Sequence, residues 1–162
     1  MDIQQNQKTN GGKRFAGIGN RHIDDQIRYA IKTCSRLIHQ KGYVLVSGGA
    51  RGCDEEFEAF FPEHRKIILR ARDATQKAIK MAEDFHPAWH QCNSYARALL
   101  GRNAMIIMGE DLKTPADFVL CYCANEERGG TALSLNIARF YKIPVFNLAD
   151  DTGLDVVKYI ED

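Results

Sequence analysis

The sequence has no long hydrophobic run, no large excess of charge and no obvious secretion signal. No apolar stretch approaches the roughly 20 residues of a membrane-spanning helix, so we expect no membrane partner. The formal net charge is +1, which leaves a local basic patch as the only electrostatic route to a polyanion. The polar start predicts a disordered tail over 1–12, a single domain over 13–162 and a cytoplasmic protein.

Cysteine spacing gives no sign of a metal or disulfide framework. The cysteines are odd in number and form no C-x-x-C pair, which favours reduced, buried thiols. The histidines also lack metal-ligand spacing, and Pro87 separates His86 from His90. We therefore expect no metal and no cofactor, and we find no Cys-His nucleophile pattern. The five cysteines are Cys34, Cys53, Cys92, Cys121 and Cys123.

Short apolar runs alternate with segments of helical period along the chain. Strands are predicted at Arg14–Gly19, Tyr43–Ser47, Lys66–Arg70, Asp117–Tyr122 and 143–148. Helices are predicted over 25–41, 54–61, 74–83, 89–107, 131–141 and 154–160. This alternation predicts an α/β, three-layer, Rossmann-like domain with a mostly parallel sheet of about five strands flanked by helices.

Three of the predicted strands end in glycine-rich loops, "GIGNR", "SGGARG" and "NEERGGT". The carboxyl ends of parallel strands share one edge of a sheet, so we expect the loops to converge there. Glycines admit a ligand close to the backbone, and helix N-termini favour phosphate. The alternative, that the glycines serve only tight turns, stays open. The predicted ligand-binding residues are Gly17, Gly19, Asn20, Arg21, Ser47, Gly48, Gly49, Arg51, Gly52, Asp54, Arg102, Asn103, Gly129, Gly130 and Thr131.

Individual side chains in these loops suggest roles. The Ser47 hydroxyl and the Arg51 guanidinium suit phosphate oxygens. Asn20 is either a turn residue or an amide that binds a base or ribose. Asp54 either stabilises the start of a helix or accepts hydrogen bonds from ribose hydroxyls. Arg102 is either an exposed residue or an anchor over the site.

Two common nucleotide motifs are absent. "GIGNRH" has His22 where a dinucleotide-binding fingerprint has its third glycine, which disfavours NAD. "SGGARGCD" lacks the Gly-Lys-Ser/Thr ending of a P-loop, which disfavours ATP hydrolysis. The locally basic run "HRKIILRARDATQKAIK" is either a solvated surface or a contact for nucleic acid.

The segments "FAGIGNRHI", "SGGARGCD", "RNAMI" and "ADFVLCY…RGGTALSLNIARFYKIPVFNL" together resemble the SLOG superfamily. That group includes the cytokinin-activating LOG proteins and the DNA-processing protein DprA. The resemblance spans Phe15 to Leu148 and is closest to small stand-alone DprA-like or YspA-like proteins, many of them encoded by phages. It implies a modified Rossmann sheet that binds nucleotides or nucleotide-derived ligands, often as a homo-oligomer.

LOG-type enzymes cleave the N-glycosidic bond of nucleoside monophosphates and carry a signature similar to P-G-G-x-G-T-x-x-E. Placing its G-T on Gly130 and Thr131 puts Ser134 where the signature has glutamate. The remaining candidate catalytic carboxylates are Asp54, Glu126 and Glu127. The leading interpretation is therefore a sensor or sequestering protein for a nucleotide. The alternatives are a nucleotide N-glycosidase of phosphoribohydrolase type and a DprA-like protein that binds single-stranded DNA.

Overall fold

The computed structural model describes residues 12–161 and contains one five-stranded parallel sheet. The expected tail, residues 1–12, lies outside the described residues except for Gly12. The strands lie in the order β3-β2-β1-β4-β5, which confirms the predicted fold class. They are β1 (Arg14–Gly19), β2 (Val44–Ser47), β3 (Lys66–Ile68), β4 (Phe118–Tyr122) and β5 (Val145–Asn147).

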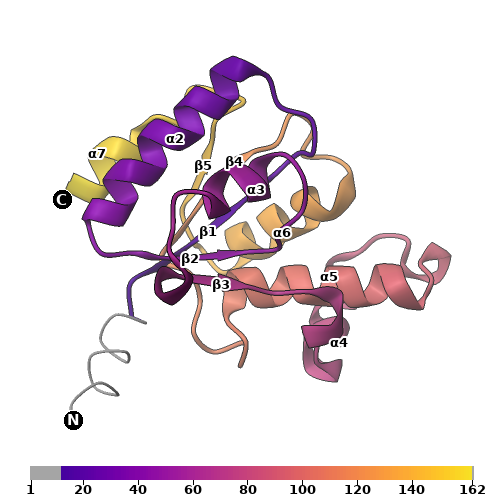
Figure 1. The fold of residues 1–162 in the computed structure, drawn as a ribbon. Helices are drawn as coiled ribbons and strands as arrows, with labels where there is room; N and C mark the ends of the chain where they lie inside the picture. The colour runs from indigo at the N-terminus through magenta and orange to yellow at the C-terminus, as the bar shows by residue number, and fades with distance from the viewer. Residues whose placement is uncertain (1–11, 162) are drawn as a thin grey trace, which may run out of the picture.

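Helices cover both faces of the sheet (Figure 1). One face carries α2 (Asp25–Gln40), α3 (Cys53–Glu58) and α7 (Asp155–Glu161). The other face carries α4 (Gln76–Phe85), α5 (Ser94–Met108) and α6 (Gly129–Phe140). Short 3-10 turns lie at Glu63–Arg65, Ala71–Asp73 and Trp89–Gln91.

Alternate residues of each central strand supply the two apolar layers. In β1, Phe15 packs on the α2 side, whereas Ala16 and Ile18 pack on the α5 side. Phe118 of β4 stacks on Phe15, with ring centroids 5.4 Å apart, and both side chains are fully buried. This period of two on strands that are buried on both faces is the pattern expected of a parallel sheet between helices.

Side-chain caps explain where two helices begin, including one that the sequence analysis placed wrongly. Asp24 caps α2 by accepting a hydrogen bond from Ile27 N at 2.9 Å, and the helix begins at Asp25, where the sequence predicted its start. The helix predicted from residue 89 instead starts after a break. Asn93 accepts from Ala96 N at 2.8 Å and caps α5, while Trp89–Gln91 forms a separate 3-10 turn.

The strand order reverses between β1 and β4. The chain passes outward from β1 to β3, crosses through α4 and α5, and returns to pair β4 with the other side of β1. Loops at such a reversal turn away from each other at the carboxyl ends of the strands, and this leaves a crevice in open α/β sheets. The crevice expected from this topology lies beside Gly19 and Tyr122, the paired last residues of β1 and β4.

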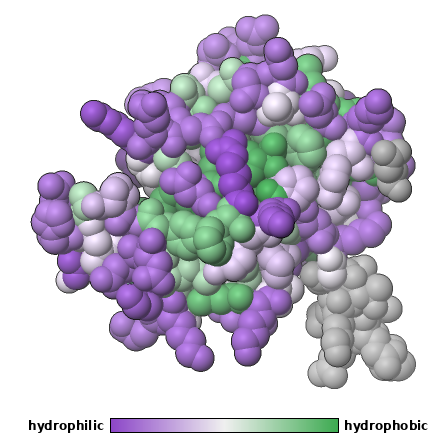
Figure 2. Space-filling view, turned by 180° about the vertical axis from the view of Figure 1, so that it is seen from behind, coloured by the Kyte–Doolittle hydropathy of each residue, from purple (hydrophilic) through white to green (hydrophobic). Residues whose placement is uncertain are grey.

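Among residues 12–161, no helix combines the length and apolar character needed to span a bilayer. Figure 2 shows the rear face of the molecule, where hydrophobic residues gather near the middle and hydrophilic residues surround them.

Phe118→Ala should lower the free energy of unfolding by about 3 to 5 kcal/mol, because it removes a fully buried ring and leaves a cavity. Urea denaturation measures the change. Tyr29→Ala is the control, since the Tyr29 side chain is 72% exposed. Equal effects of the two substitutions would contradict the assignment of Phe118 to the core.

Candidate functional site at the carboxyl edge of the sheet

A cavity of about 490 Å³ lies at the carboxyl edge of the sheet. Its lining comes from the loop after β1, the start of α3, the length of α5 and the start of α6. It brings together nine of the residues predicted from the sequence. They are Gly19, Asn20, Arg21, Asp54, Arg102, Asn103, Gly129, Gly130 and Thr131.

The remaining predicted residues lie beside the cavity lining rather than in it. The Ser47 hydroxyl is buried and donates a hydrogen bond to Gly17 O at 2.6 Å. Gly17 itself lies inside β1, where an added Cβ would come within 2.8 Å of Leu45 and Phe57. The Arg51 side chain is exposed. Ligand roles for these residues, and for Gly48, Gly49 and Gly52, stay predictions.

Backbone contacts bind the first loop to its two neighbours. Asn20 N donates to Tyr122 O at 2.9 Å, and the Asn20 side-chain oxygen accepts from Ala124 N at 2.8 Å. Asn20 O also accepts from Cys53 N at 3.2 Å. Gly52 adopts φ +81°, and a Cβ there would lie 2.5 Å from Asn20 O. The close approach of the two loops therefore requires glycine at position 52.

Arg102 extends from α5 onto the loops that follow β2 and β3. One terminal nitrogen donates to Gly48 O at 3.1 Å and to Leu69 O at 2.8 Å. Its Nε donates to the Asn103 side-chain oxygen at 2.9 Å. Arg70 adds a weaker contact to Gly48 O at 3.4 Å. The guanidinium of Arg102 thus holds the loop backbone in place while lining the cavity.

Asp54 is the titratable group best placed for acid-base chemistry in the cavity. Its side chain is almost completely buried, and it accepts a hydrogen bond from Ala50 N at 3.3 Å. Burial raises the pKa of Asp54 to about 6, although the Ala50 N–H and the charge of Arg102 oppose this change. A carboxyl group that titrates near neutral pH can donate or accept a proton under physiological conditions.

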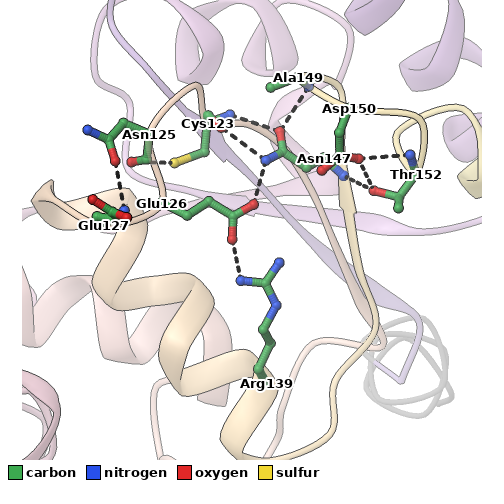
Figure 3. A network of polar contacts seen from close by, with 9 residues as sticks. All are labelled: Cys123, Asn125, Glu126, Glu127, Arg139, Asn147, Ala149, Asp150 and Thr152. Carbon is green, nitrogen blue, oxygen red and sulfur yellow. Dashed lines mark hydrogen bonds and ion pairs between the residues drawn. The ribbon is translucent and has the colours of Figure 1, made fainter.

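The other two candidate carboxylates do not line the cavity. Glu126 accepts hydrogen bonds from Arg139 of α6 and, at 2.8 Å, from the Asn147 side chain (Figure 3). The hydrogen bond from Arg139 lowers the pKa of Glu126. Glu127 is exposed next to it. Ser134, which occupies the glutamate position of the LOG signature, lines the cavity and donates to Gly130 O at 3.0 Å.

The two helix starts near the cavity differ in charge. The first turn of α3 carries Asp54, Glu55 and Glu56, whereas the first turn of α6 carries no acid. No side chain caps α6, and Gly129 and Gly130 place its first backbone groups at the cavity wall. A helix of 12 residues with a free, uncapped start attracts anions, and acidic residues in the first turn oppose this.

Sequence reasoning missed two polar residues and an apolar wall. His86 and Cys92 both line the cavity, with Cys92 Sγ 3.8 Å from His86 Nε2. Residues six apart do not face each other on a helix, and on an extended strand they would lie about 20 Å apart. The 3-10 turn Trp89–Gln91 instead folds the chain back to join them. Part of the apolar wall comes from Ala96, Leu99 and Leu100 of α5. Within residues 12–161, no three His, Cys, Asp or Glu side chains gather to hold a metal.

Comparison with known proteins identifies a shared fold. No family model matches the chain, and no curated protein matches it. A solved structure of DNA processing protein A from Helicobacter pylori, reported for its single-stranded DNA binding mode, superposes with a TM-score of 0.57. The match has 19% sequence identity and covers 91% of this chain and 72% of that chain. The chain therefore has a DprA-like, Rossmann-like fold.

Gly52→Ala should lower the free energy of unfolding more than Gly42→Ala does. The Gly42→Ala substitution should lower it by about 1 to 2 kcal/mol, because only the positive φ opposes a Cβ there. Both glycines have positive φ, but a Cβ at Gly42 meets no atom within 4 Å, whereas one at Gly52 strikes Asn20 O and Arg21 O. Urea denaturation of the two variants measures the difference. Equal losses would contradict the close packing of the two loops.

Asp54→Asn should change how stability depends on pH. Between the ordinary pKa of 3.8 and the raised pKa of about 6, folded Asp54 stays protonated while the unfolded chain has lost the proton. The contribution of Asp54 to stability therefore falls as pH rises through this window. The difference between the unfolding free energies, Asp54→Asn minus wild type, should therefore become more positive as the pH rises from about 4 to about 6.5.

Denaturation at a series of pH values measures this change, with exposed Asp151→Asn as the control for losing a carboxylate. A pH profile for Asp54→Asn that runs parallel to wild type would show that burial does not raise the pKa of Asp54.

Proposed function

We propose that the protein binds a nucleotide or nucleotide-derived ligand in the cavity, as a sensor or sequestering protein. The observation that carries the proposal is the cavity at the reversal of strand order, which the uncapped start of α6 enters together with Arg21 and Arg128. Its volume of about 490 Å³ falls within the usual range for small-molecule sites. We also propose that the chain belongs to the SLOG superfamily.

The phosphate is best accommodated at the start of α6. Gly129, Gly130 and Thr131 offer backbone N–H groups there, and exposed Arg21 and Arg128 add positive charge at the cavity wall. The loop after β2 is a weaker candidate for the phosphate site. Three acids open α3, and the guanidinium groups of Arg70 and Arg102 already donate to Gly48 O.

The rest of the nucleotide fits the other walls. Leu99 and Leu100 provide an apolar surface for the face of a base. Asp54 lines the same cavity and can accept hydrogen bonds from ribose hydroxyls. Asn103 adds an amide whose oxygen is already bound by Arg102.

A second candidate function is nucleotide hydrolysis of the N-glycosidase type. The buried, raised-pKa carboxyl of Asp54 in the cavity favours it, because this reaction needs a carboxylate near the glycosidic bond. The serine at position 134 weighs against it, since a hydroxyl cannot replace the signature glutamate.

A third candidate is binding of single-stranded DNA, which the neighbour's reported binding mode favours. Exposed Arg70, Arg72 and Lys77 form a basic segment that runs from the end of β3 into the first turn of α4 and suits a phosphate backbone. A homo-oligomeric state, a phage origin and a cytoplasmic location stay predictions from the sequence.

Isothermal titration of nucleoside monophosphates against the matching nucleosides tests the main proposal. The monophosphate should bind more tightly, and Arg128→Ala or Arg21→Ala should each weaken it by about tenfold through loss of a charge-assisted hydrogen bond. Arg36→Ala, on the exposed side of α2, is the control. Equal binding of nucleoside and monophosphate would contradict the phosphate site, and an effect confined to Arg51→Ala would move it to the loop after β2.

Mass analysis of the same incubations separates the alternatives. Intact nucleotide recovered from the denatured protein supports a binding protein. Free base that appears with wild type and not with Asp54→Asn supports the hydrolase. Salt-sensitive oligonucleotide binding that is weakened by Arg70→Ala combined with Arg72→Ala, without monophosphate binding, supports the DNA-binding alternative.

A further inference from the structure

The segment between α4 and α5 presents a thiol and an imidazole to the cavity as a contacting pair. Cys92 Sγ lies 3.8 Å from His86 Nε2, and both residues line the cavity. The segment is firmly held: the His86 and Trp89 rings meet edge to face at 5.9 Å, and Arg97 lies over the Trp89 ring at 5.2 Å. Arg97 also donates to Trp89 O at 3.1 Å.

Backbone contacts determine which nitrogen of His86 carries the proton. Ala88 N donates to His86 Nδ1 at 3.0 Å, so Nδ1 presents a lone pair. In the neutral ring the proton is then on Nε2, which faces Cys92 Sγ and donates to it. Cys92 in turn lies 3.9 Å from Ala88 O, an acceptor for the thiol proton. His86 therefore stabilises a thiolate as a hydrogen-bond donor and does not act as its base.

The other four cysteines differ from Cys92 in access. Cys34, Cys53, Cys121 and Cys123 are buried in the core, whereas Cys92 is only partly buried. Burial raises the pKa of Cys34 to about 11 and that of Cys53 to about 12, and it also raises the pKa values of Cys121 and Cys123. Thiols that are buried and protonated are poor nucleophiles, so Cys92 is the exception among the five.

We propose that Cys92 is a covalent modification site in the cavity, where it forms a mixed disulfide with a small-molecule disulfide. The Cys92 thiol first loses its proton to solvent, and the resulting thiolate accepts a hydrogen bond from the Nε2–H of His86. The thiolate then attacks one sulfur of the small disulfide, the S–S bond breaks, and the departing thiolate takes up a proton. The disulfide is the oxidant, and a free thiol reverses the reaction.

The adduct also blocks ligand binding. Cys92 shares the cavity with the apolar wall at Leu99 and Leu100. A group the size of a short peptide, joined to Cys92 Sγ, therefore occupies the space that we assign to the base of the nucleotide. This second part rests on the proposed nucleotide binding, whereas the reactivity of the thiol does not. Oxidation of the surroundings would thereby release or exclude the nucleotide.

Treating the folded protein with oxidised glutathione and mapping the modified peptides by mass tests the reactivity. Cys92 should react roughly tenfold faster than any other cysteine, in line with its access and its hydrogen-bond donor. Cys92→Ser should remove the fast reaction, and a reducing thiol should restore the unmodified mass. Modification of Cys92 at the rate of the buried cysteines would overturn the proposal.

Variants of His86 test its part. His86→Ala should slow the reaction of Cys92, and His86→Gln, which keeps a side-chain N–H near the Nε2 position, should retain part of the rate. Urea denaturation of each variant reports whether it stays folded. An unchanged rate in a folded His86→Ala variant would overturn the role of His86.

Titration of nucleoside monophosphate into modified and unmodified protein tests the blocking. Loss of binding after modification, restored by reduction, supports it. Equal binding by both forms would overturn the blocking. Failure of the unmodified protein to bind would instead overturn the proposed function and leave the reactivity of Cys92 standing on the peptide map.

Discussion

The guanidinium of Arg102 is the contact on which the arrangement of the cavity depends. It comes from the middle of α5 and binds the carbonyls of Gly48 and Leu69, which follow two adjacent strands. One side chain thereby fixes the position of α5, which forms part of the apolar wall, relative to the loops after β2 and β3. Because Gly48 has no Cβ, the guanidinium can approach this carbonyl closely. A lysine ammonium could donate to the two carbonyls, as one terminal nitrogen of Arg102 does, but it has no second nitrogen for the contact with Asn103.

The charges around the cavity follow from this arrangement. Near the start of α3, Asp54 lies close to Arg102, whose donors are already bound by backbone carbonyls and Asn103, and Glu56 pairs with Arg28 at 2.8 Å. The positive charge on that side is therefore largely used within the protein. On the α6 side, Glu126 binds Arg139 and Asn147 and thereby faces away from the cavity, while Arg128 is exposed at its wall. The cavity therefore has one side, at the start of α6, that attracts anions, and another side, at the start of α3, where the Asp54 carboxyl dominates. A ligand with a phosphate at one end and hydroxyl groups nearby matches that division.

The sequence predicted the sheet and the convergence of the three loops because glycine, capping residues and apolar runs act locally. The helical period predicted α2 from residue 25, where the structure begins it, and the apolar run Tyr43–Ser47 predicted the strand β2. The sequence does not show which partner a polar side chain takes when the candidates are distant along the chain. The Ser47 hydroxyl, for which a ligand role stays a prediction, donates to Gly17 O in the core. The pairing of His86 with Cys92 depends on a turn that the periodicity around Trp89 concealed.

The packing of the loops also constrains how this edge of the protein can diverge. Gly19 lies where a Cβ would strike Cys53 and Tyr122 O, and Gly52 lies where one would strike the backbone at Asn20 and Arg21. Neither position can accept a larger residue unless the facing loop shifts at the same time. Substitutions at positions 19, 20, 52 and 53 are therefore expected to covary among related chains. The outer helix faces carry no such mutual restriction and are free to drift independently.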